Sequence, residues 1–268
     1  MLLLMGKITT QRNKTENHVY TLPCKPGSVY VNFGADCLNE CRFCVERFGN
    51  FFGYELGREY SKEGIIEGLE RIVRKSKTPT EIVICGIGEP FLLYDELIQT
   101  ARYCKELFGA NIPVRADTSG LWWGKSRNLS FLEYLDSLSI SLNAESEEKY
   151  NQICQPKISD AYGILMDFIQ TLSKEKEKRE QFPDIRLTLV DTSRKDLMPS
   201  RRDTDLPGDC PVPDIQKCQE IADRFGFPLV VKHLFIDSHG CWDPEQIENQ
   251  TLSGEYIKKC AECKTRHI

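Results

Sequence analysis

Three cysteines stand close together early in the chain, at Cys37, Cys41 and Cys44, with the spacing C-x3-C-x2-C. Iron–sulfur clusters are held by cysteine thiolates, and cubane clusters held only by protein usually use four of them. Three thiolates on one loop would leave one iron without a protein ligand, and a metal needs an open position to bind and activate a small molecule. A zinc site would need a fourth ligand nearby, which the local sequence lacks. The pattern therefore favours a [4Fe–4S] cluster with one open iron.

Apolar, β-branched runs alternate with helical patterns about six times along the chain. Such alternation predicts an α/β fold with a parallel sheet and right-handed crossovers. A complete (β/α)8 barrel takes about 250 residues, whereas about six units end here near residue 235, so we expect an open, partial (β/α)6 barrel. The strands are expected at 29–33, 81–85, 113–117, 138–142, 185–190 and 229–235, and the helices at 61–75, 94–108, 146–153, 160–177 and 214–225.

These limits divide the chain into three parts. We expect an N-terminal segment at 1–27, the barrel at 28–235 and a short cysteine-bearing C-terminal extension at 236–268. The connection at 193–213 is rich in Pro, Asp and Arg. A connection of that length inside a compact domain is usually a lid, a binding loop or disordered.

Polar motifs follow the predicted strands, where parallel barrels carry their chemistry. Gly88-Glu89-Pro90 follows the second strand, and its carbonyls and carboxylate can accept hydrogen bonds from an ammonium group. Asp117-Thr118-Ser119-Gly120 follows the third strand. At the end of the fourth, Ser141 and Asn143 occupy alternate positions and could face the barrel interior together. A plain turn at Gly88 and helix capping by Ser141 and Asn143 are the alternatives.

Taken together, these motifs resemble those of the radical S-adenosylmethionine (SAM) superfamily. Gly86-Ile87-Gly88-Glu89-Pro90 is similar to its GGEP motif, and Asp117-Thr118-Ser119-Gly120 to its D-T-N-G motif. The resemblance implies an oxygen-sensitive enzyme in which the open iron chelates SAM and one electron cleaves it to methionine and a 5′-deoxyadenosyl radical, which takes hydrogen from a substrate. An external one-electron reductant such as flavodoxin or ferredoxin is implied as a partner. The implied SAM-binding residues are Phe43, Gly88, Glu89, Pro90, Asp117, Ser119, Ser141 and Asn143.

A narrower resemblance is carried by the segments 83–90, 141–144, 150–156 and 215–222, which look like those of radical SAM proteins linked to TatD-type nucleases. This similarity sharpens the family and leaves the substrate unidentified. The D-T-S-G motif also leaves open an activase of glycyl-radical enzymes. A non-catalytic iron–sulfur or metal-binding protein on the same scaffold is the alternative from another functional class.

The chain has twelve cysteines, and several lie in predicted loops or the tail. Cys260 and Cys263 have the C-x2-C spacing that is common among metal ligands. With Cys241 and Cys210 they could form a second metal or iron–sulfur site. The alternative is a reduced, exposed pair near a frayed terminus.

The composition gives weaker guidance on partners and location. The formal net charge is −5, so no global positive field predicts nucleic-acid binding. The apolar run at 1–5 is shorter than the roughly 7–15 residues of a secretory signal, and no stretch approaches the roughly 18 apolar residues of a membrane span. We therefore expect a cytoplasmic protein without a membrane partner.

Overall fold

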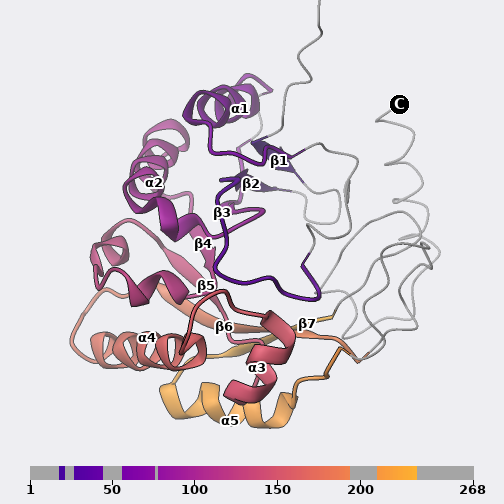
Figure 1. Cartoon of the computed structure of the whole chain (residues 1–268). Helices are drawn as coiled ribbons and strands as arrows, with labels where there is room; N and C mark the ends of the chain where they lie inside the picture. Colours follow the sequence, from indigo (N-terminus) through magenta and orange to yellow (C-terminus); the bar gives the residue numbers. More distant parts are fainter. Residues whose placement is uncertain (1–17, 22–26, 45–55, 76–77, 194–209, 234–268) are drawn as a thin grey trace, which may run out of the picture.

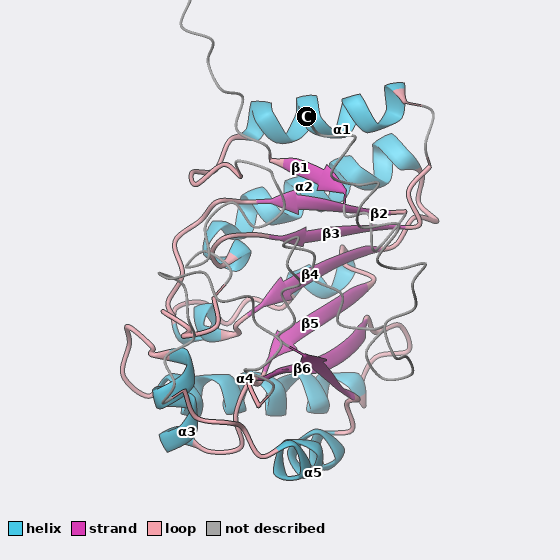
Figure 2. Ribbon diagram, turned by 90° about the vertical axis from the view of Figure 1, so that its right-hand side faces the viewer, coloured by secondary structure: helices cyan, strands magenta, loops and turns pink. Residues whose placement is uncertain are grey.

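The computed structural model describes residues 18–21, 27–44, 56–75, 78–193 and 210–233. Its centre is a seven-stranded sheet in the order β1 to β7 (Figures 1 and 2). Neighbouring strands from β2 to β7 are parallel, whereas β1 is antiparallel to β2. The strands are β1 Val19–Thr21, β2 Ser28–Asn32, β3 Glu81–Cys85, β4 Val114–Thr118, β5 Ser137–Ser141, β6 Asp184–Asp191 and β7 Leu229–His233.

Helices occupy the crossovers between the parallel strands. Figure 1 shows α1, α2 and α4 along one side of the sheet, with α5 next to α4. The helices are α1 Lys62–Arg74, α2 Tyr94–Phe108, α3 Glu147–Cys154, α4 Ala161–Lys176 and α5 Ile215–Phe225, and the short 3-10 turns are η2 Pro90–Leu93, η3 Leu121–Gly124 and η4 Ser130–Glu133. The expected α/β fold, an open partial barrel, is therefore confirmed.

The side chains of each strand alternate between the two faces of the sheet. On the outer face, apolar residues such as Ile82, Ile84 and Ile140 are fully buried in the main core with the helices. The alternate residues point to the inner face, where Tyr30 and Val83 form a second, smaller apolar cluster. Because the helices bury only the outer face, the inner face can carry polar and charged side chains.

Local signals place the helix ends as the sequence indicates. The Ser61 hydroxyl accepts a hydrogen bond from the Gly64 N–H (3.0 Å) and caps α1. Gly226 ends α5 in the left-handed conformation. Strand β1 was not expected and lies before residue 28, where the barrel was predicted to begin. Residues 194–209 of the long connection at 193–213, and residues 234–268, lie outside the described residues. Within the described ranges, no helix is long and apolar enough to cross a membrane.

Candidate active site

The three closely spaced cysteines lie on one loop that begins where β2 ends. Cys37, Cys41 and Cys44 are all partly exposed, and none of them is disulfide-bonded. The Cys44 N–H donates to the Cys41 carbonyl (3.0 Å), so the loop turns tightly between these two residues. Burial, followed by the charges of Glu89 and the other two cysteines, raises the pKa of the Cys37 thiol to about 12. A thiolate at Cys37 therefore needs a bound metal to hold it ionised at neutral pH.

The arrangement of the thiols bears on which metal group fits. Within the described part of the chain, no three His, Cys, Asp or Glu side chains gather around a point that could hold a single ion. Zinc collects its ligands around one ion, whereas the thiolates of a cubane bind different iron atoms and lie further apart. The same loop contains a buried acceptor, Asn39 Oδ1, that has no hydrogen-bond partner. Three cysteine thiols on one loop are the donor set of a cubane cluster that leaves one iron open.

The turn after β3 packs directly against the cysteine loop. A Cβ atom on Gly88, whose φ is +129°, would lie only 1.6 Å from the Ala35 carbonyl oxygen, so the position accepts only glycine. The Glu89 N–H donates to the Asp36 carbonyl (2.9 Å). The buried Asn32 side chain adds a third link, because its oxygen accepts from the Ile87 N–H (3.0 Å). The two motifs therefore form one unit at the carboxyl ends of β2 and β3.

The carboxylate of Glu89 is occupied by protein donors. Glu89 is 1% exposed, and its two oxygens accept from the Thr118 hydroxyl (2.8 Å), the Ser119 N–H (2.6 Å) and hydroxyl (2.5 Å), and the Phe91 N–H (3.2 Å). An ionised carboxylate offers about four acceptor positions, and all four are used. Burial raises the pKa of Glu89, although these hydrogen bonds act in the opposite direction. Pro90 follows as the first residue of η2, which Glu89 caps.

Asp117 is paired with a buried arginine. Its carboxylate forms an ion pair with Arg115, two residues earlier on β4. Burial would raise the pKa of Asp117, but the cations of Arg115, Lys232 and Arg186 outweigh it and hold this pKa below its ordinary value. Asp117 is thus an anion on the inner face of the sheet, and about a third of its side chain, 31%, is exposed.

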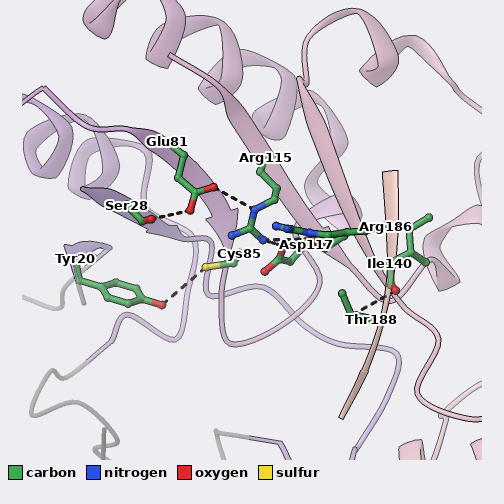
Figure 3. A network of polar contacts seen from close by, with 10 residues as sticks. Tyr20, Ser28, Glu81, Cys85, Arg115, Asp117, Ile140, Arg186 and Thr188 are labelled. Carbon is green, nitrogen blue, oxygen red and sulfur yellow. Dashed lines mark hydrogen bonds and ion pairs between the residues drawn. The ribbon is translucent and has the colours of Figure 1, made fainter. Parts of the chain in front are cut away.

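A chain of polar contacts crosses the inner face from β2 to β6 (Figure 3). The Ser28 hydroxyl donates to Glu81 (2.6 Å), and Glu81 pairs with Arg115 (3.5 Å). The Ser139 hydroxyl accepts from both Arg115 (3.3 Å) and Arg186 (2.9 Å). Each of five neighbouring strands supplies one residue of this inner-face polar chain. This polar chain was not predicted from the sequence, although a charged residue such as Arg115 within an apolar strand was a signal.

The remaining predicted SAM-binding residues lie around the same edge. Phe43 is half-buried and packs against the main core, and Ser141 is partly exposed at the end of β5. Asn143 lies beyond that strand with a left-handed φ of 58°, so the strand alternation no longer applies to it. Its Nδ2 instead donates to the Cys154 sulfur (3.7 Å). The capping alternative is wrong, because Ser146 caps α3.

Of the predicted second metal site, only Cys210 is among the described residues. It is 2% exposed, and its thiol donates to the Pro211 carbonyl (3.8 Å). Cys241, Cys260 and Cys263 lie outside the described residues, so the second site stays a prediction.

Comparison with known proteins agrees with this geometry. Residues 31–176 match the Radical SAM superfamily, more than half of the chain, and the chain therefore belongs to this superfamily. It is an enzyme whose cofactors are a [4Fe–4S] cluster and SAM. The match covers the end of β2, the cysteine loop, the Gly88 turn, the strands β3 to β5 and the helices α1 to α4.

The curated relatives carry a more specific name. The chain is 27% identical over 168 residues to the probable dual-specificity RNA methyltransferase RlmN of Lachnoclostridium phytofermentans. The aligned region covers 61% of this chain and 45% of that protein. It is 29% identical over 163 residues to the probable dual-specificity RNA methyltransferase RlmN of Staphylococcus carnosus. That aligned region covers 58% of this chain and 43% of the relative. The chain thus spans less than half the length of these relatives. These relatives do not bear on the narrower resemblance to TatD-linked proteins.

Proposed function

We propose that this enzyme uses SAM reductively. One electron from a cluster on Cys37, Cys41 and Cys44 breaks a carbon–sulfur bond of the SAM sulfonium. The products are methionine and a 5′-deoxyadenosyl radical, which becomes 5′-deoxyadenosine by taking a hydrogen atom from a substrate. The observation that carries the proposal is the close packing of Gly88 against Ala35, because cluster and SAM must meet where these two segments meet.

The proposed roles of the surrounding residues follow from their partners. Since the Glu89 carboxylate already accepts four hydrogen bonds, we assign it to positioning the turn, and we assign the SAM ammonium to backbone carbonyls around Gly88. Pro90 fixes the start of η2 behind the turn. Phe43 next to the adenine and Ser141 next to the ribose or carboxylate remain the proposed side-chain contacts.

Asp117, Ser119 and Asn143 have protein partners in the structure. Thr118 and Ser119 donate to Glu89, and Asp117 pairs with Arg115. The D-T-S-G motif therefore has a structural explanation here, which weakens the alternative of a glycyl-radical activase. Asn143 is held by Cys154 through its amide nitrogen, and its oxygen is the part we propose to face SAM.

The test is anaerobic reconstitution with iron and sulfide, followed by addition of SAM and dithionite. We expect 5′-deoxyadenosine and methionine in equal amounts, formed slowly even without substrate. Cys37→Ala should abolish both products. Cys104→Ala is the matched control, because Cys104 is a buried thiol on α2, far in sequence from the cysteine loop. Product formation by Cys37→Ala at the native rate would rule the proposal out, and a native protein without product would favour the non-catalytic alternative.

RNA is a candidate substrate, because relatives that match 58–61% of this chain are named RNA methyltransferases. The expectation of no strong nucleic-acid signal rested on net charge, which does not exclude a local contact surface. Adding RNA to the same assay tests this candidate: RNA-dependent stimulation of 5′-deoxyadenosine formation supports it, and no stimulation removes it. The external electron donor and the cytoplasmic location remain predictions.

A further inference from the structure

The carboxyl end of α3 lies against the cysteine loop, although the two are more than a hundred residues apart in sequence. The Glu40 N–H donates to the carbonyls of Cys154 (3.0 Å) and Gln155 (3.2 Å), and the Arg42 N–H donates to the carbonyl of Ile153 (2.9 Å). Carbonyls in the last turn of a helix have no partner within the helix. Amides of the cysteine loop supply those partners here, so the loop continues the hydrogen bonding of α3.

The contact extends past the end of the helix. The Lys157 N–H donates to the Leu38 carbonyl (2.8 Å), and Asn39 forms an antiparallel bridge with Pro156. Residues 38–42 and 153–157 therefore lie side by side along their backbones. Because Cys41 lies within this paired segment, a shift of α3 would move at least one of the cluster cysteines.

One side-chain contact links Tyr150, near the centre of α3, to Asn39, which lies between Cys37 and Cys41 in the sequence. The Nδ2 of Asn39 donates to the hydroxyl oxygen of Tyr150 (2.9 Å). Tyr150 is 0% exposed and Asn39 is 6% exposed, so water does not replace this bond easily. The N–H of the same Asn39 donates to the Cys37 sulfur (3.4 Å). Tyr150 is thus two hydrogen bonds away from a cluster cysteine.

Helix α3 itself is held at three places. Ser146 caps its first turn by accepting from the Lys149 N–H (3.3 Å), and Cys154 accepts from Asn143 (3.7 Å). The Tyr150 ring lies 5.7 Å, centroid to centroid, from the ring of Tyr162 on α4. The cysteine loop is therefore docked on a helix that has its own contacts with the rest of the protein.

We infer that Tyr150 is a positioning residue for the cluster, acting through Asn39 on the Cys37 sulfur. Hydrogen bonds to the sulfurs and solvent exposure set the reduction potential of an iron–sulfur cluster, and outer partners orient the ligands of a metal group. The inference rests on the proposed cluster site. It adds to that site Tyr150 of α3, which lies outside the C-x3-C-x2-C motif.

The test compares Tyr150→Phe with Tyr162→Phe. Both changes remove only a hydroxyl, but Tyr162 has no hydrogen bond to the cysteine loop in the described structure. In the cluster-free protein, we expect amide hydrogen exchange of residues 38–42 to become roughly 2–10-fold faster in Tyr150→Phe and to stay unchanged in Tyr162→Phe. In the reconstituted protein, the midpoint potential of the cluster, followed by electron paramagnetic resonance, should shift in Tyr150→Phe alone.

Asn39→Ser gives a second route if Tyr150→Phe does not fold, because it shortens a loop side chain without opening the core. It should reproduce both the faster exchange and the shifted potential. Native exchange rates and a native potential in either folded variant would overturn the inference. Faster exchange with an unchanged potential would also overturn it, since the contact would then be structural only. The exchange measurement needs no cluster, so native exchange rates in Tyr150→Phe would overturn the inference whether or not the proposed function holds.

Discussion

Ser119 donates two hydrogen bonds to one carboxylate oxygen of Glu89, through its backbone N–H (2.6 Å) and its hydroxyl (2.5 Å). This pair joins the end of β3 to the end of β4. Because the backbone N–H of Glu89 also donates to the Asp36 carbonyl, the loops after β2, β3 and β4 meet at this one residue. Glu89 therefore organises the edge where the cofactors are proposed to bind.

Glu89→Gln should destabilise the protein strongly. The amide would place an NH2 group against donors that now face an oxygen, leaving buried donors without an acceptor, which costs about 1–3 kcal/mol each. We expect a clear loss of unfolding free energy in chemical denaturation of the cluster-free protein. SAM affinity should fall as well, because the Gly88 turn loses its support.

The control for this substitution is Glu133→Gln, which changes an exposed carboxylate in η4. It should alter stability by less than about 0.5 kcal/mol. If Glu89→Gln proved as stable as this control while SAM affinity dropped, Glu89 would contact SAM directly and the positioning role would be wrong.

Gly88→Ala should block cluster assembly while leaving the sheet folded. The added Cβ would lie 1.6 Å from the Ala35 oxygen, so the cysteine loop or the turn must move. We expect iron content after reconstitution to fall by more than half, with a native circular dichroism spectrum. Gly109→Ala is the matched control: Gly109 also has a positive φ, +100°, but its Cβ would meet nothing within 4 Å. Equal iron contents in the two variants would contradict the proposed packing of turn and loop.

The sequence predicts the parallel part of the sheet well, because β2 to β7 are apolar runs separated by long helical patterns. The predicted and observed ends of β2 to β6 differ by at most one residue, as at 113–117 against Val114–Thr118, and β7 begins at Leu229 as predicted. Strand β1 was missed because its three residues, Val19–Thr21, are too few to show a period. Its pairing depends on contact with β2, which a local pattern does not contain.

The candidate active site could also be predicted only in part, because many of its contacts join residues that are far apart in the sequence. The spacing of Cys37, Cys41 and Cys44 is a local pattern and places all three on one loop. The partners of Glu89 are not local, since Ser119 lies 30 residues away. Asn39 and Tyr150 are separated by 111 residues. Residue type indicated which groups could do chemistry, whereas their actual partners depended on how the crossovers brought strand ends together.

Asp117 should make stability depend on acid pH. Its pKa in the folded protein lies below the ordinary value of 3.8, so folding favours its ionised form. This contribution is fully present above about pH 5 and is lost as the pH falls through the folded-state pKa. Asp117→Asn removes it, and we expect a melting temperature roughly 2–8 °C lower at pH 7.

The same comparison at low pH provides the check. The difference in melting temperature between native protein and Asp117→Asn should begin to shrink below about pH 5, where the carboxyl of the unfolded chain takes up its proton, and should disappear only below the folded-state pKa. Asp184→Asn is the control, since it removes an exposed carboxylate at the start of β6 and should change stability by less than about 0.5 kcal/mol. A difference that stays constant with pH would mean that the charge of Asp117 does not stabilise the fold.

The last prediction concerns the C-terminal cysteines. If Cys260 and Cys263 hold a metal, they need partners, for which Cys241 and Cys210 are the proposed candidates. Cys210 is buried just before α5, so its thiol would have to leave the Pro211 carbonyl to become a ligand. Iron and zinc should be counted per chain after anaerobic purification, in the native protein and in Cys260→Ser/Cys263→Ser. A second site predicts about one zinc, or clearly more than four irons, in the native protein, and its loss in the variant. About four irons in both proteins, without zinc in either, would show that these cysteines bind no metal.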